Sequence, residues 1–106
     1  MFITFMQNNS GGYLIQNEDV DLFVIIEGND LEEILNRAEI IFEDYRVYCP
    51  YCGYRWSDDC MDEDDLTTEP MIWDIKAHKF SSKSWKGNII IYRLDGSKEV
   101  IKIKEG

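Results

Sequence analysis

The cysteine turn at residues 49–53, Cys-Pro-Tyr-Cys-Gly, is the part of the chain best suited to chemistry. Two thiolates separated by two residues can chelate one zinc ion, and a glycine after the second cysteine lets the turn tighten. A closed structural site needs four ligands. The candidate zinc ligands are therefore Cys49, Cys52 and Cys60, with His78 as a fourth donor. The alternative is that the cysteines are small, half-buried apolar side chains, and we expect no bound cofactor.

A second candidate site lies between Trp73 and Arg93, where aromatic and cationic residues are interleaved. This pattern suits a planar, anionic ligand, because a nucleobase stacks on an aromatic ring and a phosphate pairs with Lys or Arg. The predicted ligand-binding residues are Phe80, Trp85, Lys86, Asn88 and Arg93, with Asn8, Asn9, Arg55 and Trp56 as further walls. Phe80 or Trp85 would stack the base, while Lys86 and Arg93 would hold phosphate. The alternative is that Trp73 and Trp85 are core or interface aromatics beside ordinary surface lysines.

The chain carries no recognisable catalytic signature. It has one histidine, and no serine or cysteine stands in a local nucleophile motif with it. It also lacks a glycine-rich phosphate loop between a strand and a helix. The acidic run at 58–65 lacks the ligand spacing and central glycine of a calcium loop, so we expect it to be an exposed loop. We therefore predict a protein that is not an enzyme.

Charge is divided unevenly along the 106 residues. Residues 1–70 contain 17 acids and three bases, whereas residues 71–106 contain four acids and eight bases, and the net charge is −10. The overall acidity opposes direct DNA or RNA binding, which depends on neutralising phosphates. The charge split favours contact between unlike surfaces, so we expect a homo-oligomer, a dimer or higher. No apolar stretch approaches the length of a membrane span, and an odd number of cysteines fits a reducing cytoplasm.

The elements that must position these residues follow from periodicity. Residues 2–6, 13–15 and 20–26 are predicted strands, the first two joined as a hairpin by the Asn- and Gly-rich segment 7–12. Asp30 with Glu33 resembles a helix-capping box. A helix follows to residues 44–46, with apolar residues on one face: Leu31, Ile34, Leu35, Ala38, Ile41, Phe42 and Tyr45.

The C-terminal third reads as strands. Residues 71–75 form a predicted strand, and residues 88–94 and 98–103 form a hairpin around Asp95-Gly96. The predicted fold is a single α+β domain over residues 1–106. Its antiparallel or mixed sheet has five to six strands, with one long amphipathic helix on one face.

Two stretches carry a resemblance to a known group of proteins. The segment 5–13, with its Gln-Asn-Asn-Ser-Gly-Gly core, and the Cys-x-x-Cys-Gly-x-Arg-Trp segment at 49–56 resemble a family of small proteins encoded by tailed bacteriophages. The order of the other features is also similar: a Val-Ile-Ile-Glu strand (24–27), an acidic helix, a Thr-Glu-Pro (68–70) and a final Tyr-x-x-Asp-Gly hairpin (92–96). The resemblance implies a phage product made in the cytoplasm of a bacterial host.

The function expected from the resemblance is binding. Small phage proteins without catalytic signatures often bind host factors, and one class sequesters nucleotide-derived immune signals as symmetric oligomers. The leading prediction is an anti-defence protein of this kind, with a small anionic nucleotide-like ligand. A second prediction is an acidic protein–protein inhibitor, or nucleic-acid mimic, that covers a basic surface of a host enzyme. A third is a zinc-stabilised structural module.

Overall fold

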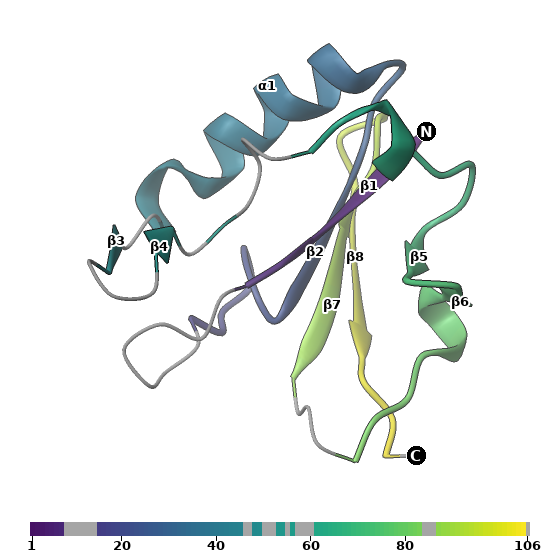
Figure 1. Cartoon of the computed structure of the whole chain (residues 1–106). Helices are drawn as coiled ribbons and strands as arrows, with labels where there is room; N and C mark the ends of the chain where they lie inside the picture. The colour runs from purple at the N-terminus through teal and green to yellow at the C-terminus, as the bar shows by residue number, and fades with distance from the viewer. Residues whose placement is uncertain are drawn as a thin grey trace.

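The computed structural model describes residues 1–7, 15–45, 48–49, 53–54, 56, 61–83 and 87–105; residues 48–49 and 53–54 are described by their backbone alone. Strand β1 (Phe2–Met6) pairs antiparallel with β2 (Phe23–Glu27), which pairs parallel with β7 (Asn88–Tyr92). Strand β7 pairs antiparallel with β8 (Lys98–Lys102). The main sheet is therefore mixed, in the order β1-β2-β7-β8, with β1 and β8 as its edges (Figure 1).

The remaining described elements are short, apart from one helix. Helix α1 (Leu31–Phe42) continues into a 3₁₀ turn, η2 (Glu43–Tyr45). Two small hairpins pair β3 (Tyr48–Cys49) with β4 (Gly53–Tyr54) and β5 (Met71–Ile72) with β6 (Ile75–Lys76). Two further 3₁₀ turns are η4 (Glu63–Asp65) and η5 (Ala77–Lys79). None of the helices in the described ranges is long and apolar enough to cross a membrane.

Both faces of the sheet are covered (Figure 1). Alternate residues of β2 point to opposite faces, so Val24 and Ile26 join the core under α1 with Ile34, Ala38 and Phe42. Phe23 and Ile25 join a second core on the other face, with these residues: Phe2, Leu22, Ile72, Ala77, Phe80, Ile89, Ile91 and Ile103. Burial on two sides explains why β2 and β7 are continuous apolar runs. It also fixes the segment that contains β5, β6 and η5 against the sheet.

The helix and the C-terminal hairpin confirm the sequence signals. Asp30 caps α1, since its carboxylate accepts the backbone N–H of Glu33 at 2.8 Å. The Glu33 side chain accepts the backbone N–H of Asn29 at 2.9 Å, one residue earlier than a capping box requires. In the β7–β8 hairpin, Gly96 has φ of 91°, which a three-residue loop with a left-handed glycine needs. Local chemistry was sufficient at both positions.

Two expectations about the sheet are wrong, and a third falls mostly outside the described residues. The main sheet has four strands, not five to six. Strand β1 pairs with β2, and Ile15 is outside any strand; residues 13–14, the rest of the strand predicted to pair with β1, lie outside the described part. The predicted strand 71–75 is instead a tight hairpin that turns at Trp73-Asp74. In each case non-local packing on the sheet decides the pairing, which periodicity does not report.

Candidate functional site

Phe80, a predicted base-stacking residue, lies in the core. It is 3% exposed and packs edge-to-face against Phe23, with ring centroids 5.4 Å apart. Trp73 packs against the same ring at 5.8 Å. Because both neighbours and the sheet cover the ring, Phe80 presents no face to a ligand. Its role is to anchor η5 and the 71–80 segment to β2.

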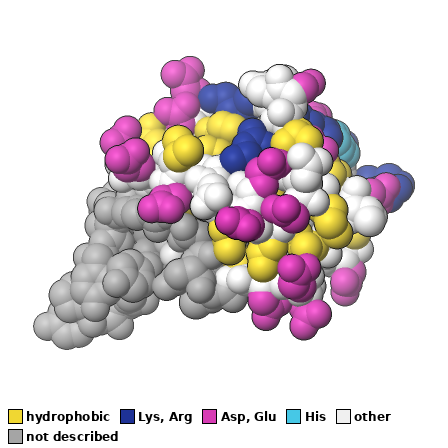
Figure 2. Space-filling view, turned by 90° about the horizontal axis from the view of Figure 1, so that it is seen from above, with side chains coloured by type: hydrophobic (Ala, Val, Ile, Leu, Met, Phe, Trp, Pro, Cys, Tyr) yellow, Lys and Arg dark blue, Asp and Glu magenta, His cyan; other side chains and the backbone are white. Residues whose placement is uncertain are grey.

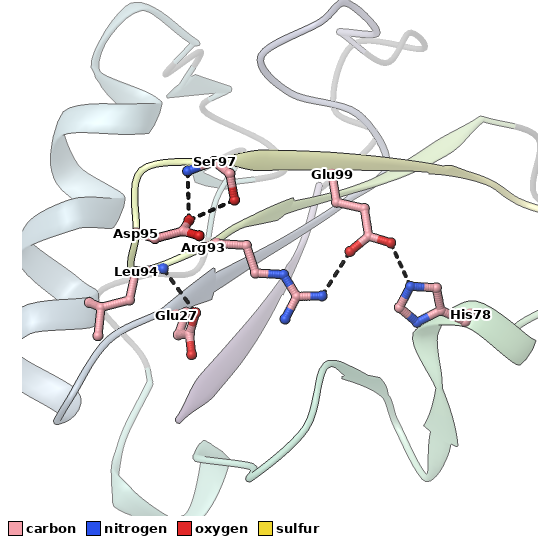
Figure 3. Close-up of polar contacts among 7 residues, drawn as sticks. All are labelled: Glu27, His78, Arg93, Leu94, Asp95, Ser97 and Glu99. Carbon is pink, nitrogen blue, oxygen red and sulfur yellow. Dashed lines mark hydrogen bonds and ion pairs between the residues drawn. The ribbon is translucent and has the colours of Figure 1, made fainter.

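Arg93, a predicted phosphate ligand, is engaged within the protein (Figure 3). Its guanidinium donates to Glu99 at 2.7 Å and lies over the Phe2 ring, 5.7 Å from the centroid. His78 contacts the other oxygen of the same carboxylate at 2.6 Å. The hydrogen bond from Arg93, followed by that from His78, lowers the pKa of Glu99 below its usual value. The positive charge of Arg93 is therefore compensated before any anion arrives.

The other predicted walls do not form one site in the described residues. Trp56 is buried and stacked on Phe42, with centroids 4.1 Å apart, and its Nε1 donates to the carbonyl of Tyr45 at 3.1 Å. Asn88 begins β7 opposite Lys102 and is half-buried. The rest of the predicted set falls outside the described residues: Trp85, Lys86, Asn8, Asn9 and Arg55.

The predicted zinc ligands are likewise not brought together among described residues. Cys49 lies in β3 opposite Gly53, but its side chain, Cys52 and Cys60 fall outside the described part. His78 is bonded to Glu99 (Figure 3). In the residues open to description, no group of three or more His, Cys, Asp or Glu is placed to hold a metal ion. The zinc site therefore stays a prediction about the cysteine turn.

The structure instead forms a groove beside the edge strand β1. Its volume is about 320 Å³. Phe23 and Ile72 lie at its apolar side, and Thr4 and Met6 of β1 form one wall. The remaining lining residues come from the 61–67 segment and from the β5–β6 hairpin: Met61, Asp64, Asp65, Thr67, Met71, Trp73 and Asp74. Segments nearly 70 residues apart in sequence are joined here, for Thr4 Oγ1 donates to the carbonyl of Met71.

The backbone of β1 opens onto this groove. Gly28 N–H donates to Met1 O at 2.9 Å and Gln7 N–H donates to Leu22 O at 2.8 Å, so the odd-numbered residues of β1 face β2. The even-numbered residues face outward. Phe2 uses its outward groups in a bridge to Thr67, at 2.8 and 2.9 Å. Across the described residues, no hydrogen bond is made by the outward backbone groups of Thr4 and Met6.

Trp73 stands at the rim of the groove in an unusual conformation. It has φ of 55° at the first position of the two-residue turn between β5 and β6, and its side chain is 59% exposed. A bulky residue rarely adopts a positive φ, which is the preference of glycine. The ring packs edge-to-face on Phe23 at 6.0 Å. An exposed indole is thus fixed beside the groove at some cost in backbone strain, as happens at functional sites.

The charge around the groove is negative. Asp64, Asp65 and Asp74 are exposed and line it. The four ion pairs between described residues all lie elsewhere, so none of these carboxylates is paired with a described base. A second hollow of about 490 Å³ lies beside α1 and is lined by Asp30, Leu31, Glu32, Leu35, Asn36 and Glu63. Figure 2, a view from above, shows Asp and Glu side chains around hydrophobic surface, with some Lys and Arg side chains on the same face.

The whole chain matches one protein family. A family model described as a domain of unknown function (DUF7296) matches residues 1–106. The chain belongs to this family. No curated protein and no solved structure matches it. The arrangement of the residues themselves is therefore the guide to function.

Sequence reasoning missed the groove and its tryptophan. The relevant signal was the segment 71–76, in which Trp-Asp is preceded by Met-Ile and followed by Ile-Lys. Tight turns of this kind usually carry Gly, Asn or Asp at the position with positive φ, so the Trp-Asp pair hid the turn. The unpaired edge of β1 was also hidden, because edge position depends on the whole strand order.

Proposed function

We propose that this protein is a non-catalytic binding protein that covers a basic surface on a partner protein with the acidic surface around the groove beside β1. The observation that supports it most is the groove beside β1, where three exposed carboxylates have no described basic partner. Opposite potentials on two surfaces steer association and suppress wrong partners. An acidic surface of this kind suits a partner protein whose usual ligand is a nucleic acid, because such a partner has a basic binding surface.

The location of the basic residues supports a protein partner over a nucleotide. Among the lining residues of both described hollows there is no Lys, Arg or His. Phe80 and Trp56 are buried, and Arg93 is paired with Glu99. A nucleotide would need the residues outside the described ranges, such as Trp85 and Lys86, to supply the whole site. Sequestration of a nucleotide signal is therefore the second candidate function.

In the setting implied by the resemblance to phage proteins, the partner is a host enzyme that acts on nucleic acid. Occupying its basic surface would exclude its substrate. This anti-defence role extends the proposal and depends on the phage origin.

The proposal is tested by affinity capture from bacterial lysate with a variant that lacks two of the groove charges and with a matched control. The variant is Asp64→Asn with Asp74→Asn, which removes two groove charges and leaves the Asp62–Asp65 turn contacts in place. The control is Glu18→Gln with Glu39→Gln, which removes two exposed charges elsewhere. We expect wild type and control to retain a basic protein that the variant loses and that added duplex DNA displaces.

Two results would contradict it. Equal capture by variant and control would show that the groove acids do not matter. A nucleotide that co-purifies with the wild-type protein, detected by native mass spectrometry, would favour the sequestering function instead.

A further inference from the structure

The two edges of the sheet differ in how they are protected. Exposed strand edges present unpaired backbone groups, and proteins commonly block them with lysines, proline or bulges. On β8, Arg93 N–H donates to Ser97 O and Ile103 N–H to Gly87 O, so the outward positions are the even-numbered ones. Two of those three are Lys98 and Lys102. The outward positions Thr4 and Met6 of β1 carry no charge.

The walls of the groove fit an extended chain. Met6, Met61 and Met71 line it beside the free edge. Methionine is flexible and polarizable, so it adapts to different side chains and is common at surfaces that accept varied peptides. Phe23 and Ile72 provide apolar surface for a side chain that points inward, and the exposed Trp73 ring stands at the rim.

The length of the free edge limits the contact. The bridge from Phe2 to Thr67 closes one end, which leaves the outward groups of Thr4 and Met6. These lie two residues apart, roughly 7 Å along the strand. They offer two N–H donors and two C=O acceptors, enough for a short extended segment of about four to six residues. In an added strand, alternate side chains would face the groove.

The charges select the composition of that segment. Asp64 and Asp65 come from the η4 side of the groove and Asp74 from the β5–β6 turn. Acids on two sides of an apolar floor favour a strand in which Lys or Arg alternates with apolar residues. An acidic segment would meet like charge.

We infer that the groove beside β1 binds an extended basic segment of the partner protein, which pairs with Thr4 and Met6 as an added strand of the sheet. This inference rests on the proposed function, of which it names the contact. Main-chain hydrogen bonds would supply affinity, as in other β-strand additions, and the apolar floor and three acids would supply specificity.

The first experiment uses a synthetic probe, a capped hexapeptide of alternating Lys and Val, with a Glu-Val peptide as the control. Binding is measured by chemical-shift changes in the full-length protein. We expect shifts at Thr4, Met6 and Trp73 with the Lys-Val peptide and none with the Glu-Val peptide. Along an extended peptide, the N–H groups of the Val residues point to one edge of the strand and those of the Lys residues to the other. Methylating the backbone nitrogens of all Val, or of all Lys, therefore removes the donors on one edge at a time. We expect one of these two peptides to bind at least tenfold more weakly and the other to bind unchanged.

The second experiment changes the edge itself. Met6→Pro removes an outward N–H that no described residue uses, so the pairing with β2 is kept. Val100→Pro makes the same change at an outward position of β8 and is the matched control. We expect Met6→Pro to weaken binding of the Lys-Val peptide at least tenfold and Val100→Pro to leave it unchanged. Trp73→Gly, which suits the positive φ and so preserves the turn, should also weaken binding.

The outcomes separate this inference from the proposed function. The inference is overturned if the Lys-Val peptide does not bind, if neither methylated peptide loses affinity, or if both proline variants bind equally. Loss of a captured basic protein with the Asp64→Asn, Asp74→Asn variant would still support the acidic binding surface in those cases. A concentration-dependent dimer in light scattering that Met6→Pro abolishes would instead assign the edge to a second copy.

Discussion

Strands β1 and β8 are the two edges of the same sheet, but the charged side chains around them differ in whether they are paired within the protein. At the β8 edge, Lys98 pairs with Asp19 at 3.3 Å, and Glu99 pairs with both Arg93 and His78. These pairs are internal, and Asp19 also accepts the Tyr45 hydroxyl at 2.7 Å. Beside β1, the acids Asp64, Asp65 and Asp74 have no basic partner in the described part of the chain. The charges that form these pairs at the β8 edge stabilise the fold, while the acids beside β1 are available to a partner.

The difference also separates stability from binding. Changes near β8 should alter the free energy of unfolding, because they break contacts already made. Changes at the rim of the β1 groove should alter binding with smaller effects on folding. The residues beneath the groove are an exception, since Phe23 and Ile72 belong to the core as well.

The largest expected effect comes from Phe80→Ala. Phe80 is buried between Phe23 and Trp73, so truncation leaves a cavity and should cost about 3–5 kcal/mol of unfolding free energy. Urea denaturation measures this. The control in the same segment is Ile75→Ala, whose side chain is 44% exposed and which should change stability by about 0.5 kcal/mol or less. A Phe80→Ala protein as stable as wild type would contradict the core role and would support the prediction that Phe80 stacks on a ligand.

How far the sequence predicted these regions depends on how local their causes are. The cap at Asp30 and the hairpin at Gly96 depend on a few neighbouring residues, and both were predicted. Phe80 was assigned to a ligand because an aromatic beside lysines has the same local pattern whether it is buried or exposed. Its burial depends on β2, more than 50 residues away. The groove and the free edge depend on strand order. Strands β2 and β7 are neighbours in the sheet although α1 and other elements separate them in sequence, and no local signal reports that order.

The second prediction tests the contact at the end of β7. Arg93→Ala removes the ion pair to Glu99 and the contact with the Phe2 ring. Because the side chain is partly exposed, we expect a loss of about 1–2 kcal/mol, the sum of a modest ion pair and a cation–π contact. Lys102→Ala is the control, since Lys102 is exposed and makes none of the described ion pairs. If Arg93 instead served a ligand, both variants would unfold at the same urea concentration as wild type.

The third prediction concerns the strained turn at the rim of the β1 groove. Trp73→Gly and Trp73→Ala both remove the ring contacts with Phe23 and Phe80. They differ in that glycine accepts φ of 55° without a Cβ penalty. The glycine variant should therefore be more stable than the alanine variant by about 1 kcal/mol. Thermal unfolding of the pair decides it, and an alanine variant that is the more stable of the two would show that the turn carries no strain.

The smallest expected effect is a pH dependence confined to the β8 side. Hydrogen bonds from Arg93 and His78 lower the pKa of Glu99 in the folded protein, so the unfolded chain binds a proton there more readily. Glu99 therefore contributes stability that is present above its unfolded pKa and is lost as the pH falls through its folded pKa. Between about pH 5 and about pH 3, wild type should lose stability more steeply than Glu99→Gln.

The comparison of these two proteins isolates one carboxyl group. Asp19, whose pKa is also lowered, chiefly by the Tyr45 hydroxyl and Lys98, is present in both and cancels. Asp64→Asn is the matched change at the β1 groove, where no bond from Arg or His to the carboxylate is described. Its urea midpoint should follow the wild-type pH profile. If Asp64→Asn flattened that profile as much as Glu99→Gln, the groove acids would be part of the internal charge network, and the distinction between the two edges would fail.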